Sequence, residues 1–193
     1  MSQEYDSVEL VGDSTVSQFA RAVVVAALTA AFAQVSIPLP GLPAPVSFQV
    51  FAVYFAGLLL GPLWGGVALT LYLLVGVAGA PVFSNGAAGL GYALGPTGGY
   101  LLGFLVAAVL IGAIVHRRIE PRSLADVSLV VQAGALVAGL VAIYALGVPW
   151  LALSTGMGMT KAASVGMVVF VPGDLIKIIA TLALVKGGHL ALE

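Results

Sequence analysis

Residues 47–80 read SFQVFAVYFAGLLLGPLWGGVALTLYLLVGVAGA, and this stretch decides the fold class. It contains no Asp, Glu, Lys, Arg or His, and it is long enough for two membrane-crossing segments separated by a tight turn at Gly61-Pro62. The charge-free run extends outward from Ala22 to Val115, and a second one covers Val127 to Thr160. A water-soluble domain needs ionisable side chains on much of its surface. We therefore expect most of this chain to be surrounded by lipid.

The composition supports a membrane protein and excludes several other classes. Charged residues make up 8% of the 193 residues and the mean hydropathy is +1.13, whereas an ordinary soluble chain carries roughly 25% charged residues. A net charge of −1 provides no basic field for nucleic acid. The lack of cysteine excludes disulfides and thiolate metal sites. Because the sequence has no phosphate-binding loop, no HExxH and no convincing Ser–His–Asp set, we expect neither an enzyme nor a bound cofactor or metal.

Six apolar segments are predicted, and they define an all-α integral membrane protein with six transmembrane helices in one bundle. A polar, acidic N-terminal extension (1–18) precedes the transmembrane domain (19–187), and a short tail (188–193) follows it. The segments themselves lie at 20–37, 47–61, 63–80, 99–116, 127–147 and 162–186.

The distribution of cations predicts the orientation of this bundle. With six crossings, both termini share one side of the membrane with the 61–62 turn and the 117–126 loop. That side holds five cations and the other holds only Lys161, and such an excess marks the cytoplasmic side. We therefore predict a multi-pass protein of the cell membrane with both termini in the cytoplasm. The five cations are Arg21, Arg117, Arg118, Arg122 and Lys186.

Asp174 and Lys177 are the sharpest functional signal, because they are the only ionisable pair inside an apolar segment. Residues three apart share a helix face, so both side chains can point into one cavity. A charge within a membrane helix is costly, and such residues usually mark a ligand or ion pathway. The alternative is a structural ion pair that neutralises itself. Pro172-Gly173, just before the pair, can open the helix locally.

Two further groups of residues have a functional and an ordinary interpretation. Gln49, Ser84, Asn85, Thr97 and Tyr100 lie at the ends of segments or in the long loops, where they can orient a polar ligand or serve as loop and capping residues. Ala22, Ala26 and Ala30 repeat at four-residue spacing in the first segment, and such a row lets another helix approach closely. Internal packing is the commoner use of such a row, but we favour contact with another subunit.

Several motifs resemble those of the BioY family, the biotin-binding S components of energy-coupling factor (ECF) transporters. The resemblance covers about residues 20–186, and its specific parts are GPTGGYLLGF and PGDLIK. One departure is Ser84-Asn85-Gly86, which replaces a Gly-rich stretch expected after Phe83. The matching motifs are VSFQ (46–49), AGLLLGP (56–62), GAPVF (79–83), LGPTGGYLLGF (94–104) and PGDLIK (172–177).

The resemblance implies a biotin site near the outer face. The distribution of cations places loops 38–46 and 81–98 on that face, where we expect them to roof the site. It implies three kinds of partner: biotin, a transmembrane coupling subunit and a pair of cytosolic ATPases. It also implies that the alanine row of the first helix contacts the coupling subunit. Its site residues are Asp174, Lys177 and Tyr100, followed by Asn85 and Gln49.

The chemistry of biotin agrees with these residues. Asp174 can accept both ureido N–H groups, and Lys177 can hold the carboxylate or neutralise Asp174 in the empty site. Phe48, Phe83 and Tyr100 can pack against the bicycle. Two alternatives remain at this point: an S component for another vitamin, and a stand-alone secondary carrier that uses Asp174 as a proton or cation site. A carrier often contains internal repeats, and the two halves of this sequence show no convincing repeat.

Overall fold

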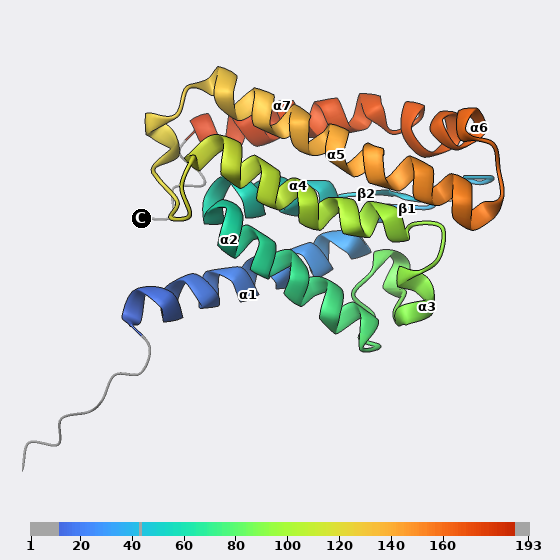
Figure 1. Ribbon diagram of the computed structural model, residues 1–193, viewed down its shortest axis with the longest axis horizontal. Helices are drawn as coiled ribbons and strands as arrows, with labels where there is room; N and C mark the ends of the chain where they lie inside the picture. Colours follow the sequence, from blue (N-terminus) through green and yellow to red (C-terminus); the bar gives the residue numbers. More distant parts are fainter. Residues whose placement is uncertain (1–11, 43, 188–193) are drawn as a thin grey trace, which may run out of the picture.

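The computed structural model describes residues 12–42 and 44–187, which form a bundle of long helices (Figure 1). Five helical stretches of the described chain are long and apolar enough to cross a membrane, and Met159–Lys186 is one of them. The chain is therefore an all-α protein with five candidate membrane spans. Its long helices are α1 (Asp13–Gln34), α2 (Gln49–Val77), α4 (Gly98–His116), α5 (Leu129–Thr155) and α7 (Val171–Lys186).

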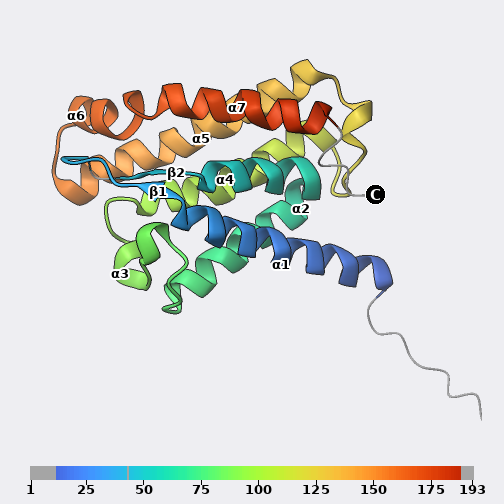
Figure 2. The ribbon, with the colours of Figure 1, turned by 180° about the vertical axis from the view of Figure 1, so that it is seen from behind.

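Helix α2 reverses its direction at Gly61 (Figure 2). Gly61 has φ 74° and ψ −176°, a conformation that glycine adopts at low cost, and Pro62 follows it. A methyl group on Gly65 would lie 2.8 Å from the carbonyl oxygen of Ala56. In a continuous helix these two residues would be about 13 Å apart along the axis. The two halves of α2 therefore pack as a hairpin, and its turn is the one predicted between segments 47–61 and 63–80.

Several observed boundaries differ from the predicted ones. Helix α1 begins at Asp13, so part of the predicted extension (1–18) is helical, while residues 1–11 and the predicted tail (188–193) lie outside the described residues. Helix α5 continues to Thr155, past the predicted end at residue 147. Pro149 does not end it, because the apolar run continues beyond the proline and a proline is tolerated in membrane helices.

The last predicted segment, 162–186, is divided into three elements. Helix α6 (Met159–Ala163) leads into the π-helical turn η3 (Ser164–Val168), and α7 begins at Val171. A π-turn widens a helix by one residue, and such turns occur frequently at functional sites.

The remaining short elements lie mostly at one end of the bundle, which we call the loop end (Figure 1). There β1 (Ser36–Ile37) pairs antiparallel with β2 (Val46–Ser47), next to the 3-10 turn η1 (Ser84–Gly86) and the short helix α3 (Leu90–Ala93). The opposite end, which we call the turn end, holds Gly61 and the 117–128 connection with its 3-10 turn η2 (Leu124–Asp126).

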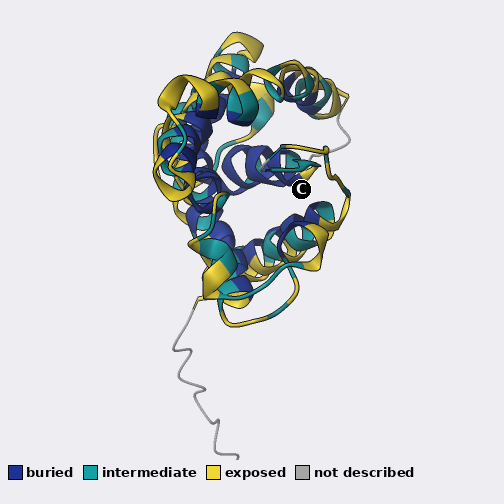
Figure 3. Cartoon of the chain, turned by 90° about the vertical axis from the view of Figure 1, so that its right-hand side faces the viewer, coloured by how far each residue is buried: buried dark blue, intermediate teal, exposed yellow. Residues whose placement is uncertain are grey.

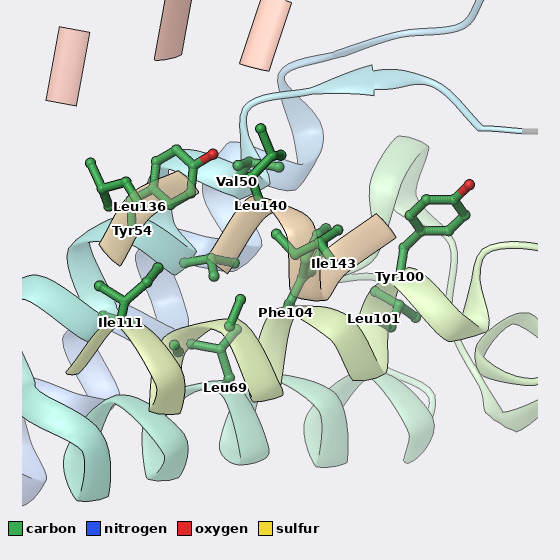
Figure 4. Close-up of a cluster of buried hydrophobic side chains, with 14 of the residues drawn as sticks. Val50, Tyr54, Leu69, Tyr100, Leu101, Phe104, Ile111, Leu136, Leu140 and Ile143 are labelled. Carbon is green, nitrogen blue, oxygen red and sulfur yellow. The ribbon is translucent and has the colours of Figure 1, made fainter. Parts of the chain in front are cut away.

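Helix α4 is the centre of the packing, with α2 on one side and α5 on the other. Its side chains Leu101, Phe104 and Ile111 are buried together with side chains of the neighbouring helices (Figure 4). Exposed residues lie mainly around the outside of the bundle (Figure 3). Many of these are large and apolar, and Val130 and Leu153 are 82% and 84% exposed. An apolar outer surface of this kind is suited to contact with lipid.

Candidate functional site

A cavity with an empty volume of ≈ 780 Å³, partly open to the outside, lies at the loop end between β2, α4, α5 and α7. One wall is apolar and includes Leu101, Phe104 and Ile143. Both long loops predicted to roof a site contribute to the lining. Its polar side chains are Ser47, Gln49, Ser84, Tyr92, Thr97, Tyr100, Tyr144, Asp174 and Lys177. A mainly apolar cavity with a few converging polar groups is the usual form of a small-molecule site.

Asp174 and Lys177 form an ion pair on the wall of this cavity. Lys177 Nζ lies 2.9 Å from Asp174 Oδ1 and donates a second hydrogen bond, 2.8 Å long, to the backbone carbonyl of Ser47. The hydroxyl of Tyr144 donates to Asp174 Oδ2. Asp174 is 5% exposed and Lys177 is 7% exposed. Buried charges are tolerated when they are paired and hydrogen-bonded, so this pair neutralises itself and at the same time faces the cavity.

The sequence places these partners within reach of one another. Pro172 and Gly173 open the first turn of α7, where a proline costs no hydrogen bond, and Asp174 follows in that turn. A carboxylate near a helix N-terminus is favoured by the helix dipole. Lys177 lies one turn further along and reaches β2, so the ion pair links α7 to the 36–47 hairpin.

Gln49 is the hub of a second buried polar cluster at the same cavity. Its Oε1 accepts hydrogen bonds from the hydroxyls of Ser47 (2.9 Å) and Ser84 (2.8 Å), and its Nε2 donates to the hydroxyl oxygen of Tyr72. The cluster connects the hairpin, the loop after α2 and α2 itself. Gln49 is 4% exposed, and its side chain lines the cavity, as predicted for a polar residue at a helix end.

Tyr100 lines the cavity from α4 and is held in place by close contacts. Its hydroxyl donates a 2.7 Å hydrogen bond to the carbonyl of Gly166 in the π-helical turn. The ring packs edge-to-face on Tyr144, with ring centroids 6.3 Å apart. Gly147 provides the space for this ring, because a side chain there would collide with it. The labelled Tyr100 in Figure 4 shows the ring rising from the start of α4.

Three other predicted residues do not line this cavity. Phe83 has no exposed surface, because it packs between Tyr72 and Tyr92. Phe48 is 42% exposed and packs on Phe51. Asn85 is exposed in a left-handed conformation (φ 59°), accepts a hydrogen bond from Ser36, and lines a second, neighbouring cavity. The structure therefore brings together Asp174, Lys177, Tyr100 and Gln49.

Tyr144 and the carbonyl of Ser47 were not predicted as site groups. Tyr144 lies inside the apolar run of α5, and a single phenol in such a run was the only available signal. The role of Ser47 depends on its backbone oxygen, which no side-chain pattern can indicate.

The predicted alanine row of α1 faces the rest of the chain. Ala22 has no exposed surface, and Ala26 and Ala30 pack against the buried core. The exposed face of the same helix carries Ala27 and Ala31, which are also four residues apart and follow Ala26 and Ala30 by one position each. A partner that approaches α1 from outside therefore meets Ala27 and Ala31 rather than Ala22.

Comparison with known proteins identifies the family. The model of the BioY family matches residues 3–193. A biotin transporter BioY of Thermotoga maritima is 40% identical over 162 residues, which is 84% of this chain and 89% of the relative. One of Rhizobium etli is 37% identical over 142 residues, 73% of this chain and 75% of the relative. A crystal structure described as the S-component for biotin from an ECF-type ABC transporter has the same fold, with a TM-score of 0.81, 24% identity and coverage of 93% and 94% of the two chains. The chain belongs to the BioY family.

Proposed function

We propose that this chain captures biotin and imports it across the cell membrane as the substrate-specific S component of an ECF-type ABC transporter. The observation that carries the proposal is the cavity at the loop end, where the buried Asp174–Lys177 pair faces an otherwise uncharged, mainly apolar wall. The names of the relatives, biotin transporters BioY, supply the ligand.

The polar and apolar parts of biotin match those of the cavity. A ureido N–H group donates to Asp174, and a charge-assisted hydrogen bond of this kind is stronger than a neutral one. Tyr100, Phe104 and Ile143 pack against the bicycle. Gln49 holds Ser47 and Ser84 at the mouth of the site. Packing against the bicycle, which the sequence suggested for Phe48 and Phe83, falls instead to residues of α4 and α5.

The hairpin within α2 supports six membrane crossings instead of five. Each half of α2 supplies one crossing, and the halves join at Gly61. Arg117, Arg118 and Arg122 lie at the turn end together with the start of α1 and the end of α7. The positive-inside rule then puts the turn end and both termini in the cytoplasm. The cavity at the loop end faces outward, which suits capture from outside the cell.

Import driven by ATP needs partners that hydrolyse it, because this sequence contains no phosphate-binding loop. We propose a transmembrane coupling subunit and two cytosolic ATPase subunits for this role, and no catalytic role for the chain itself. Helix α1 offers the coupling subunit an apolar face with small residues, Ala27 and Ala31, and with Val24, which is 66% exposed.

The proposal is tested by titrating the purified, detergent-solubilised chain with biotin, thiamine and riboflavin. Biotin is expected to bind and the other two vitamins are not. Asp174→Asn should weaken biotin binding by about 10- to 100-fold, because a charge-assisted hydrogen bond is lost. Asp126→Asn, at an exposed position of the turn end, is the matched control and should leave the affinity unchanged. Unchanged biotin affinity in Asp174→Asn would remove the assigned role of this carboxylate.

Reconstitution into proteoliposomes tests the need for partners. Biotin uptake is expected only when the coupling subunit, the ATPases and ATP are present. Uptake by this chain alone, driven by a proton or cation gradient, would instead identify a stand-alone carrier that uses Asp174.

A further inference from the structure

The charges around the two cavities at the loop end add up to zero. In the part of the chain that the structure describes, the lining of the first cavity has one cation, Lys177, and one anion, Asp174. The second cavity has an empty volume of ≈ 890 Å³ and is lined by no Asp, Glu, Lys, Arg or His. Both long loops at this end belong to the charge-free run from Ala22 to Val115. A ligand that enters here meets a single, internally neutralised pair.

Groups of the protein engage two of the three N–H donors of the one cation. Lys177 Nζ is 2.9 Å from Asp174 Oδ1 and 2.8 Å from the carbonyl oxygen of Ser47. A ligand carboxylate at Lys177 would lie beside the carboxylate of Asp174, and like charges at such close range repel each other. Lys161, the other cation predicted on this side, is exposed on α6 and lines neither cavity. The site therefore offers no separate counter-ion to a free carboxylate.

The adjacent carboxylate of Asp174 and ammonium of Lys177 suit a neutral ligand group that both donates and accepts hydrogen bonds. A cyclic urea has a carbonyl acceptor between two N–H donors that point apart, so one N–H can face Asp174 while the neighbouring oxygen accepts a hydrogen bond from Lys177. In biotin, four methylene groups separate the ureido bicycle from the carboxylate. With the ureido group at the ion pair, the carboxylate lies well away from Lys177.

The second cavity provides a place for this distant end of the ligand. It shares Ala44, Pro45, Ser84, Tyr92 and Thr97 with the first cavity, so the two are neighbours between the 38–45 loop and the 84–97 loop. Its lining is mainly apolar, and its polar side chains, Ser84, Asn85, Tyr92 and Thr97, are neutral. Such a lining offers neutral hydrogen-bonding groups to an amide and no cation to a carboxylate.

On this basis, and resting on the proposed function, we infer that the site recognises the neutral ureido bicycle and accepts biotin whose carboxyl group is converted to an amide. The substrate class then comprises biotin and biotinyl amides, including biotin joined to the side-chain amine of lysine. The amide extension lies in the second cavity and projects from the loop end.

The inference is tested by calorimetric titration of the purified full-length chain with biotin, biotinamide and biotinyl-lysine. Both amides are expected to bind with affinities within about tenfold of that of biotin. The loss of one charge-assisted hydrogen bond would weaken binding by more than this. Amide binding more than about tenfold weaker than that of biotin would overturn the inference and leave the proposed function intact. If biotin itself did not bind, the proposed function and this inference would both fail.

A paired variant makes the test independent of folding losses. Asp174→Asn/Lys177→Gln keeps the side chains similar in size and removes both charges, and the ratio of the affinities for biotin and biotinamide is compared within each protein. If Lys177 contacts the ureido group, both ligands weaken by the same factor and the ratio is unchanged. A loss confined to biotin would show that Lys177 holds the carboxylate, and would contradict the inference. Lys161→Gln is the control, and it should change neither affinity nor their ratio.

Discussion

The two ends of the bundle use buried polar groups for different purposes. At the turn end, His116 is 2% exposed, its Nε2 lies 2.9 Å from the carbonyl of Leu58, and its Nδ1 accepts the backbone N–H of Arg122. Arg122 in turn donates to the carbonyl of Val115. These bonds close a helix end and a loop onto the hairpin of α2. At the loop end, the buried Asp174–Lys177 pair borders an open cavity instead.

This difference separates stability from binding. Hydrogen bonds at the turn end satisfy backbone groups that lipid cannot satisfy. At the loop end, the buried polar side chains face a space that a ligand can fill. Some of their hydrogen bonds to the protein can therefore be replaced by hydrogen bonds to the ligand. Substitutions at the turn end should therefore affect folding, while substitutions at the loop end should affect binding as well.

Breaking the ion pair should have the largest effect. Lys177→Met leaves Asp174 buried with Tyr144 as its one side-chain partner among the described residues, and removal of one member of a buried pair costs about 3–5 kcal/mol of stability. Biotin binding should be lost as well. Asp174→Asn/Lys177→Gln should recover most of the stability, while its biotin affinity stays weaker than that of the unchanged protein. Thermal unfolding in detergent, together with biotin titration, measures both; an unchanged melting temperature in Lys177→Met would show that the pair contributes nothing to folding.

Removal of the Tyr144 hydroxyl should weaken binding more than it weakens the fold. Tyr144→Phe deletes the donor to Asp174 Oδ2, and a hydrogen bond to a charged group contributes about 1.5–3 kcal/mol. We expect biotin affinity to fall by about 10- to 100-fold. Tyr54→Phe is the matched control, because the hydroxyl of Tyr54 is buried without a hydrogen-bond partner among the described residues. Equal losses in both variants would indicate a general packing effect.

The membrane class and the Asp174–Lys177 pair were predictable from the sequence, because missing charges and isolated charges are both visible in it. The Gly61-Pro62 turn was predictable for a similar reason, since a glycine before a proline interrupts a long apolar run. The aromatic lining was predictable only in part, because Tyr100 lines the cavity as predicted but Phe48 and Phe83 do not. Phe83 was predicted to pack on the ligand, but Gly76 leaves a space that its ring fills, and this contact depends on how α2 meets the loop after it.

A methyl group at the turn end should destabilise the fold without changing the site. The Cβ of Gly112→Ala would collide with the backbone of Gly61 and Pro62, and overpacking of this kind costs about 1–3 kcal/mol. Gly134→Ala is the control, since a Cβ there meets nothing within 4 Å, and the loss of a helical glycine should stabilise by about 0.5–1 kcal/mol. Biotin affinity of the folded protein should stay the same in both. A selective loss of affinity in Gly112→Ala would show that the two ends are coupled.

The smallest effect is expected at Asn85, a loop-end residue that lines the second cavity but not the first. Asn85→Gly preserves the left-handed conformation at φ 59° and removes one exposed hydrogen bond, from Ser36, so stability should change by about 0.5 kcal/mol or less. Asn85→Ala serves as its partner variant, because alanine in this conformation is strained by about 1 kcal/mol. If Asn85 contacts the ligand through its amide, both variants lose biotin affinity equally. If it only shapes the loop, Asn85→Gly keeps the affinity and Asn85→Ala alone loses it, so titration of the two variants separates a ligand contact from a backbone role.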